Sequence, residues 1–220
     1  VMNVFNLPSQ TIVNKVIPKN AFDAYTTSRQ KKKLAEFVER IRWSNKLSPE
    51  TLNLSGKDIS EIEIFEIELR KKEEIADLLA VFDKAIPYPI IFFIFYRDQA
   101  YISASTKHLH PVQEDISIVD WTFKSDWLKI PDIKMSFDLK KNLDHVYQDF
   151  CNQLSSGLSR SKSMNELVAF EQEFFQLHNK IDKVKASLKR TVQFNRKVEL
   201  NQELKQLEAD LAKLKKAGRP

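Results

Sequence analysis

The C-terminal part of the chain carries an apolar repeat that only long helices can use. Its apolar residues are spaced alternately by four and by three positions, which is the seam of a heptad repeat. The first seam comprises Phe170, Phe174, Leu177, Ile181, Val184 and Leu188. The second comprises Leu200, Leu204, Leu207, Leu211 and Leu214. We therefore expect residues 157–220 to form a helical arm that follows a separate domain of residues 1–156.

The two seams are out of phase with each other. Continued strictly, the first seam would include Thr191 and Asn195, and neither residue is apolar. A turn near residues 193–197 would fold the arm into an antiparallel helical hairpin. The alternative is a straight coiled coil with a stutter, which needs a partner chain to cover both seams and would make the protein an oligomer through its arm. We expect the hairpin, because it covers both seams within one chain.

Residues 1–156 show a different pattern, in which strands and helices are mixed. Apolar and β-branched runs predict five strands, at residues 42–47, 61–71, 89–96, 100–107 and 116–124. Helical spacing predicts helices at residues 29–41, 73–86 and 139–154, the first with Leu34, Phe37, Val38 and Ile41 facing the core. This order predicts an α+β fold, with a mixed sheet of about five strands flanked by helices. The serine-rich stretch at residues 155–163 is the expected hinge before the arm.

Composition narrows the classes of function. The chain of 220 residues is 42% apolar and has 15 Phe, which suffices for a sizeable core. Its 3 Gly exclude a glycine-rich phosphate-binding loop. The single cysteine, Cys151, excludes an internal disulfide, and its helical surroundings predict a buried thiol. We find no signal-peptide pattern, and the longest apolar run, residues 86–96, is too short to cross a membrane, so we expect a cytoplasmic protein without membrane contact.

The positive charge of the chain is concentrated in the arm. Residues 152–220 hold 14 basic and 8 acidic residues, a net charge of +6, whereas residues 1–151 have a net charge of −1. An arm of this charge favours an acidic partner or a nucleic-acid backbone. The alternative is a solvated helix whose charges pair with one another.

The strand predicted at residues 61–71 carries an unusual number of charges. Side chains alternate across a strand, so Glu66, Glu68 and Arg70 share one face. Two carboxylates on one face could bind a divalent metal and position a water molecule. The alternative is that these glutamates pair with Arg70, or with Arg42 or Lys46 on a neighbouring strand.

The order of elements around this strand resembles that of restriction-type PD-(D/E)XK nucleases. Those enzymes place an acidic residue ahead of an E-x-K motif on a strand, and a helix and another strand follow. Here Asp58 precedes Glu68-x-Arg70, but Asp58 falls in a predicted loop and arginine replaces the lysine. The resemblance implies a diverged site at Asp58, Glu66, Glu68 and Arg70, with Mg²⁺ as its cofactor.

Four stretches of the sequence together resemble the bacterial family called domain of unknown function 4391. In order, they are RWSNKLSPETLNL, EIEIFEIELRK, DKAIPYPIIFFIF and QFNRKVELNQELKQL. The resemblance extends over nearly the whole chain. The residues that match the family motifs are Trp43, Lys46, Ser48, Pro49, Thr51, Asn53, Glu66, Glu68, Asp83, Lys84, Pro87, Tyr88, Phe194, Asn195, Arg196, Lys197, Glu199 and Asn201.

The family resemblance implies a role in DNA metabolism, because its members are often encoded near helicase and DNA-methyltransferase genes of restriction-like defence systems. We expect a non-catalytic accessory subunit, without a cofactor, that acts in a DNA restriction-modification or phage-defence complex. The expected partner is a helicase or a DNA methyltransferase. The expected contact residues are Trp43, Lys46, Arg196 and Lys197. The alternatives are the diverged nuclease and a nucleic-acid-binding protein that uses the basic arm.

Overall fold

The computed structural model describes residues 4–113, 116–155 and 163–217. The chain forms two compact units, Val1–Leu154 and Ser155–Pro220. Most of the predicted hinge at residues 155–163 lies outside the described residues. No described helix is both long enough and apolar enough to cross a membrane.

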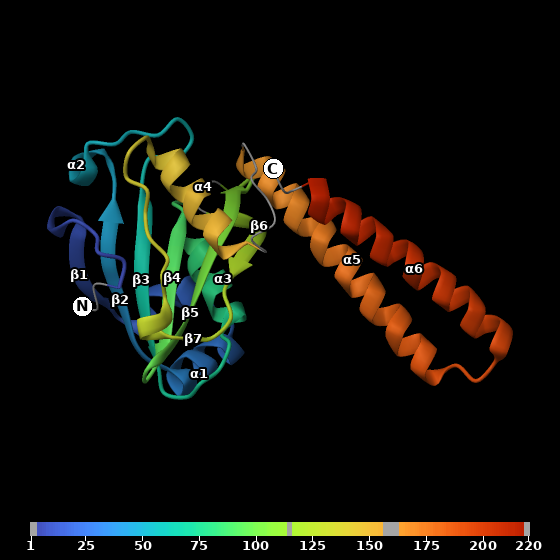
Figure 1. Cartoon of the computed structure of the whole chain (residues 1–220). Helices are drawn as coiled ribbons and strands as arrows, with labels where there is room; N and C mark the ends of the chain where they lie inside the picture. Colours follow the sequence, from blue (N-terminus) through green and yellow to red (C-terminus); the bar gives the residue numbers. More distant parts are fainter. Residues whose placement is uncertain (1–3, 114–115, 156–162, 218–220) are drawn as a thin grey trace. The chain divides into compact units, whose positions relative to one another are not determined.

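The first unit is built on one mixed β-sheet, which confirms the α+β prediction (Figure 1). Its strands are β1 (Ile12–Ile17), β2 (Val38–Leu47), β3 (Ile62–Leu69), β4 (Ile90–Tyr96), β5 (Gln99–Leu109), β6 (Ser117–Lys124) and β7 (Leu128–Lys129). Strands β1 to β6 lie in chain order across the sheet, and β7 pairs with β5. Among the strand pairs of the described residues, only β3 and β4 run parallel, and the others are antiparallel. The described sheet therefore has seven strands rather than about five.

The helices of this unit are short; three of the described ones fall between strands along the chain, and one follows the last strand. They are α1 (Ser28–Phe37), α2 (Pro49–Leu52), α3 (Ala76–Ala85) and α4 (Leu143–Leu154). Three 3₁₀ turns, at Ser9–Thr11, Lys19–Tyr25 and Ile130–Asp132, complete the described elements. Helices α3 and α4 begin later than the sequence predicted, because the residues ahead of them, 73–75 and 139–142, are not helical.

The boundary between α1 and β2 corrects the sequence prediction. The predicted helix continued to Ile41, but α1 ends at Phe37 and the strand begins at Val38. Both Val38 and Ile41 are buried in the core that α1 and α3 cover. A register shift between Val38 and Arg40 lets these two residues face the same side of the strand, although an odd number of positions separates them. Because of this bulge, two buried residues of the strand are three positions apart, which is also the spacing of buried residues on a helix.

Both faces of the central strands are covered, as the continuous apolar run of β4 predicts. Helices α1 and α3 lie on one face, and α4 lies on the other (Figure 1). Under α4, Phe150 stacks on Phe137 with ring centroids 4.5 Å apart, and Phe5 contacts both Phe150 and Phe93 edge-on. Cys151 is buried in this layer, as predicted, and burial raises the pKa of its thiol.

The loop before β3 is fastened to the start of α4. The carboxylate of Asp144 accepts hydrogen bonds from the backbone N–H groups of Lys57, Asp58 and Ile59, at 2.5, 2.9 and 3.0 Å. A Cβ at Gly56 would come within 2.1 Å of the Ile59 carbonyl oxygen, so glycine is required there for the close approach. This contact fixes where the chain enters β3.

The second unit is an antiparallel helical hairpin, the arrangement expected from the two seams. Helix α5 (Met164–Arg190) and helix α6 (Phe194–Ala217) lie side by side (Figure 1). Leu177, Ile181, Val184 and Leu200 are buried between them. Lys185 pairs with Glu208 across the hairpin at 3.3 Å. The turn comprises residues 191–193, slightly earlier than predicted, and the Thr191 hydroxyl donates to the Ser187 carbonyl at the end of α5.

Candidate functional site

Glu66 lies on the α4 side of β3, in a polar cluster beneath Phe5 and Phe93. The Ser44 hydroxyl lies 3.2 Å from its carboxylate, and the Arg42 guanidinium lies 4.0 Å away. Burial raises the pKa of Glu66, and the hydrogen bond from Ser44 and the charge of Arg42 oppose this shift. The carboxylate therefore has a local hydrogen-bond donor and a local countercharge.

Glu68 and Arg70 each pair with a different residue. Glu68 faces Arg40 on β2 at 4.0 Å, and Arg70 pairs with Glu39 at 2.9 Å. The space that Arg40, Glu66, Glu68 and their neighbours line on this face is about 30 Å³, comparable to the volume of one water molecule. The cross-strand ion pairs that the sequence offered as the alternative to metal binding are thus present.

Asp58 lies far from these two glutamates. It belongs to the loop before β3, whereas Glu68 is near the far end of that strand. The six-residue step from Ile62 to Glu68 alone spans about 20 Å. Within residues 4–113, 116–155 and 163–217, no group of three or more His, Cys, Asp or Glu side chains is placed to hold a metal ion. The strand, helix and parallel strand of the nuclease layout are present as β3, α3 and β4, but the structure does not bring its acidic residues together.

Trp43 and Lys46 lie on β2 beside Glu63 of β3, a buried acid that is not among the predicted site residues. Lys46 forms an ion pair with Glu61, and Glu63 is only 5% exposed. Burial, reinforced by the neighbouring charge of Glu61, raises the pKa of Glu63 to about 7. The nearby Trp43 indole N–H lowers the pKa of Glu63 and so opposes this shift. Within the described structure, neither the Trp43 indole nitrogen nor Glu63 Oε2 has a partner at hydrogen-bonding geometry.

The position of Glu63 could have been found from the sequence. Glu63 lies on the same face of the strand as Phe65, Ile67 and Leu69, which face the core that α3 covers. Because that face is buried, a carboxyl group on it is the one on the strand that loses most contact with water on folding. The candidate residues Glu66 and Glu68 lie on the opposite face of the strand.

A second buried charge pair joins α3 to β5. The Lys107 ammonium lies 3.1 Å from the Asp83 carboxylate, and both side chains are 3% exposed or less. Lys107 also donates to the backbone carbonyls of Asp83 and Ile86 at 3.1 and 2.7 Å. These carbonyls end α3, where the helix dipole favours a cation. This geometry gives Lys107 a structural role as the cap of α3.

The tip of the hairpin combines exposed apolar side chains with positive charge. Val192 is 91% exposed and Phe194 is 77% exposed. The stretch of residues 183–198, which contains the turn, has six basic residues and no acidic one. Arg196 pairs with Glu199 at 2.6 Å. Lys189, Arg190 and Lys197 have no acidic partner within the ranges of the chain described here. The predicted contact residues Arg196 and Lys197 thus belong to one exposed surface, which we call the hairpin tip (residues 189–198).

These features define a class of protein: a mixed α+β domain joined to a helical hairpin that has a basic, partly apolar tip. The family model described as Domain of unknown function (DUF4391) matches residues 5–211, nearly the whole chain. The protein belongs to this family. Comparison with curated proteins and with solved structures finds no match to the chain.

Proposed function

We propose that the protein is a non-catalytic accessory subunit that contacts nucleic acid through its hairpin tip. The observation that carries the proposal is the exposure of Phe194 and Val192 beside Lys189, Arg190 and Lys197, which have no acidic partner in the described part of the chain. Apolar residues of this size are normally covered in a hairpin whose seams are buried. Their exposure at the turn supports a surface that binds a partner.

The chemistry of the tip favours nucleic acid over an acidic protein. Lys and Arg side chains neutralise phosphates and release counterions, which supplies most of the affinity of non-specific binding. An exposed aromatic ring can stack on an unpaired base, an interaction worth about 1–3 kcal/mol per base. Phe194 is the first residue of α6, and Arg190 and Lys197 lie close to it in the sequence. One tip could therefore contact a base and its flanking phosphates.

The proposed setting is a bacterial DNA restriction-modification or phage-defence complex. This part of the proposal rests on the gene neighbourhoods that the family resemblance implies. A helicase or a DNA methyltransferase is the proposed partner protein. Affinity purification of the tagged protein from its host, after nuclease treatment, tests this part: we expect one of these enzymes in fixed ratio, and recovery of the protein alone would contradict the subunit assignment.

We expect the protein to bind single-stranded DNA with an affinity that falls steeply with salt. Each phosphate that the protein neutralises contributes about −0.7 to the slope of log K against log salt for single strands. Replacing Arg190 and Lys197 together by alanine should therefore make the slope shallower by about 1.4. Fluorescence anisotropy with a labelled oligonucleotide, from about 50 to 200 mM salt, measures both quantities.

The matched control removes two exposed charges of the hairpin outside the tip. The double variant Lys180→Ala and Lys205→Ala lowers the net charge of the chain by the same amount. We expect it to keep the wild-type slope. Equal losses in the two double variants would show that total charge, and not the tip, determines binding.

The metal-dependent nuclease remains the alternative proposal, because β3, α3 and β4 follow the order of the nuclease layout. We expect no cleavage of single- or double-stranded DNA by the purified protein with Mg²⁺. Cleavage that Glu68→Ala abolishes would support the diverged site and contradict the accessory-subunit proposal. Cleavage that survives Glu68→Ala would reject that site and place the activity elsewhere.

A further inference from the structure

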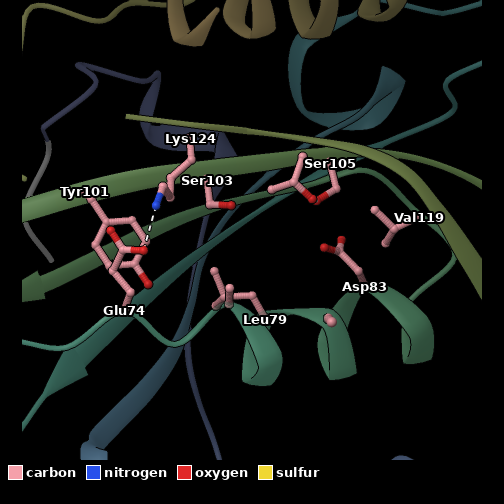
Figure 2. A pocket seen from close by; sticks show the side chains of 11 residues that line it. Glu74, Leu79, Asp83, Tyr101, Ser103, Ser105, Val119 and Lys124 are labelled. Atoms are coloured by element: carbon pink, nitrogen blue, oxygen red, sulfur yellow. Dashed lines mark hydrogen bonds and ion pairs between the residues drawn. The ribbon is translucent and has the colours of Figure 1, made fainter. Parts of the chain in front are cut away.

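A cavity of about 150 Å³ lies between α3 and the strands β5 and β6. Figure 2 shows Tyr101, Ser103 and Ser105 of β5 on one side, with Leu79 and Asp83 of α3 facing them. All the lining residues belong to the first unit. None of the acids proposed for the nuclease and none of the tip residues takes part in the cavity.

Small side chains on α3 create the space. Ala76 and Ala80 are four positions apart, so they lie one above the other on the helix and leave room where larger residues would fill it. Leu79, Val119 and the ring of Tyr101 supply the rest of the apolar lining. An apolar cavity of about 150 Å³ is large enough for one benzene-sized ring.

The floor of the cavity carries polar groups that are buried. Ser103 and Ser105 are each 2% exposed. The Ser105 hydroxyl bonds to the Thr122 hydroxyl at 3.0 Å. No hydrogen bond is formed by the Ser103 side chain with any residue that the structure describes. The Ser103 hydroxyl therefore borders the cavity without a protein partner, and a ligand in the cavity can form a hydrogen bond with it.

Charged groups flank the cavity. Glu74 and Lys124 form a 2.6 Å ion pair at one side (Figure 2). Asp83 lies at the other side, where Lys107 neutralises it. Because both carboxylates already have countercharges, the cavity offers no uncompensated charge to a ligand. The arrangement suits a neutral ligand better than an ion.

We propose that this cavity binds a neutral, single-ring aromatic ligand that carries one hydroxyl or N–H group. The ring occupies the space beside Ala76 and Ala80, between Leu79 and Val119. Its polar group makes a hydrogen bond with the Ser103 hydroxyl. This assignment is independent of the hairpin tip and of any nucleic-acid binding.

Phenol and toluene are matched probes, because they have nearly the same size and only phenol has a hydroxyl group. We expect phenol to bind with a dissociation constant of about 1 mM, within the range open to so small a ligand. Titration of the ¹⁵N-labelled protein, followed by two-dimensional NMR, should shift the amide signals of α3, β5 and β6. Toluene should bind more weakly than phenol. Shifts that map elsewhere, or equal affinity for the two probes, would overturn the proposal.

Two variants make the test specific. Ser103→Ala should weaken phenol binding about 2- to 10-fold, the effect of one neutral hydrogen bond, and leave toluene unchanged. Ala80→Leu, at a lining position where the cavity opens to solvent, should fill the cavity and abolish binding of both probes. If Ala80→Leu does not fold, Ala76→Leu serves the same purpose at the first residue of the helix. Ala186→Leu, on the exposed surface of α5, is the control and should bind both probes like the wild type. Binding that survives the cavity-filling change would contradict the assignment.

Discussion

Replacing Lys107 by methionine is expected to lower the free energy of unfolding by about 3–5 kcal/mol, the cost of removing one partner from a buried ion pair. The change leaves the Asp83 carboxylate buried without its countercharge and takes the donor from two carbonyls at the end of α3. Burial lowers the pKa of Lys107 and raises that of Asp83, so each group depends on the other to remain charged. Urea denaturation monitored by circular dichroism measures the loss.

Two controls separate the ion pair from general effects on α3. Lys84→Met changes the neighbouring exposed lysine and should alter the free energy of unfolding by less than about 0.5 kcal/mol. Adding Asp83→Asn to Lys107→Met removes the uncompensated charge, so the double variant should be more stable than Lys107→Met alone. A loss below about 1 kcal/mol in Lys107→Met would contradict the structural role of the pair.

Glu63 should make the stability of the protein depend on pH through the neutral range. Its pKa is about 7 in the folded protein, against 4.5 as the ordinary value of a glutamate. The folded state therefore holds the proton more tightly than the unfolded state does. This contribution to stability is complete below pH 4.5 and is lost as the pH rises through 7. Between pH 5 and pH 8 the loss amounts to about 2–3 kcal/mol.

The variant Glu63→Gln isolates this effect, because glutamine is neutral throughout. The free energy of unfolding of the wild type should fall by about 2–3 kcal/mol relative to Glu63→Gln between pH 5 and pH 8. Burial also raises the pKa values of Glu66 and Asp83, and the difference between two proteins that share those groups removes their contributions. Glu203→Gln, an exposed change on α6, should run parallel to the wild type. A parallel curve for Glu63→Gln would show that Glu63 ionises normally in the folded protein.

Much of the fold could be predicted because local patterns and tertiary structure agree. The continuous apolar run of β4 is buried on both faces, and the two heptad seams form the hairpin core. The prediction failed where a pattern admitted two structures. Val38 and Ile41 fit both a helix and a bulged strand, and the bulge depends on pairing with β3, which periodicity does not reveal. Strand β1 shows no alternation because its burial pattern is mostly exposed.

In the candidate sites, too, features that follow from local patterns could be predicted, and features that depend on long-range contacts could not. The faces of β3 were predicted correctly from alternation, and the Arg42–Glu66 pair follows from them. The order of Asp58 and Glu68 along the chain resembled a nuclease, but order gives no distance, and the loop that holds Asp58 is fastened to α4 instead. The cavity of Ser103 and the Asp83–Lys107 pair each join α3 to distant strands. Contacts of that kind leave no periodic signal in the sequence.

The most direct test of the central claim is to ask whether the hairpin tip touches nucleic acid. Phe194 is replaced by a photoreactive phenylalanine analogue, and the protein is irradiated with labelled single-stranded DNA in low salt. The same analogue at Phe175, an exposed ring on α5 outside the tip, is the control. We predict a DNA crosslink from position 194 that unlabelled DNA competes away, and a much weaker one from position 175. Equal crosslinking at both positions, or none at position 194, would contradict the assignment of the tip as the nucleic-acid contact.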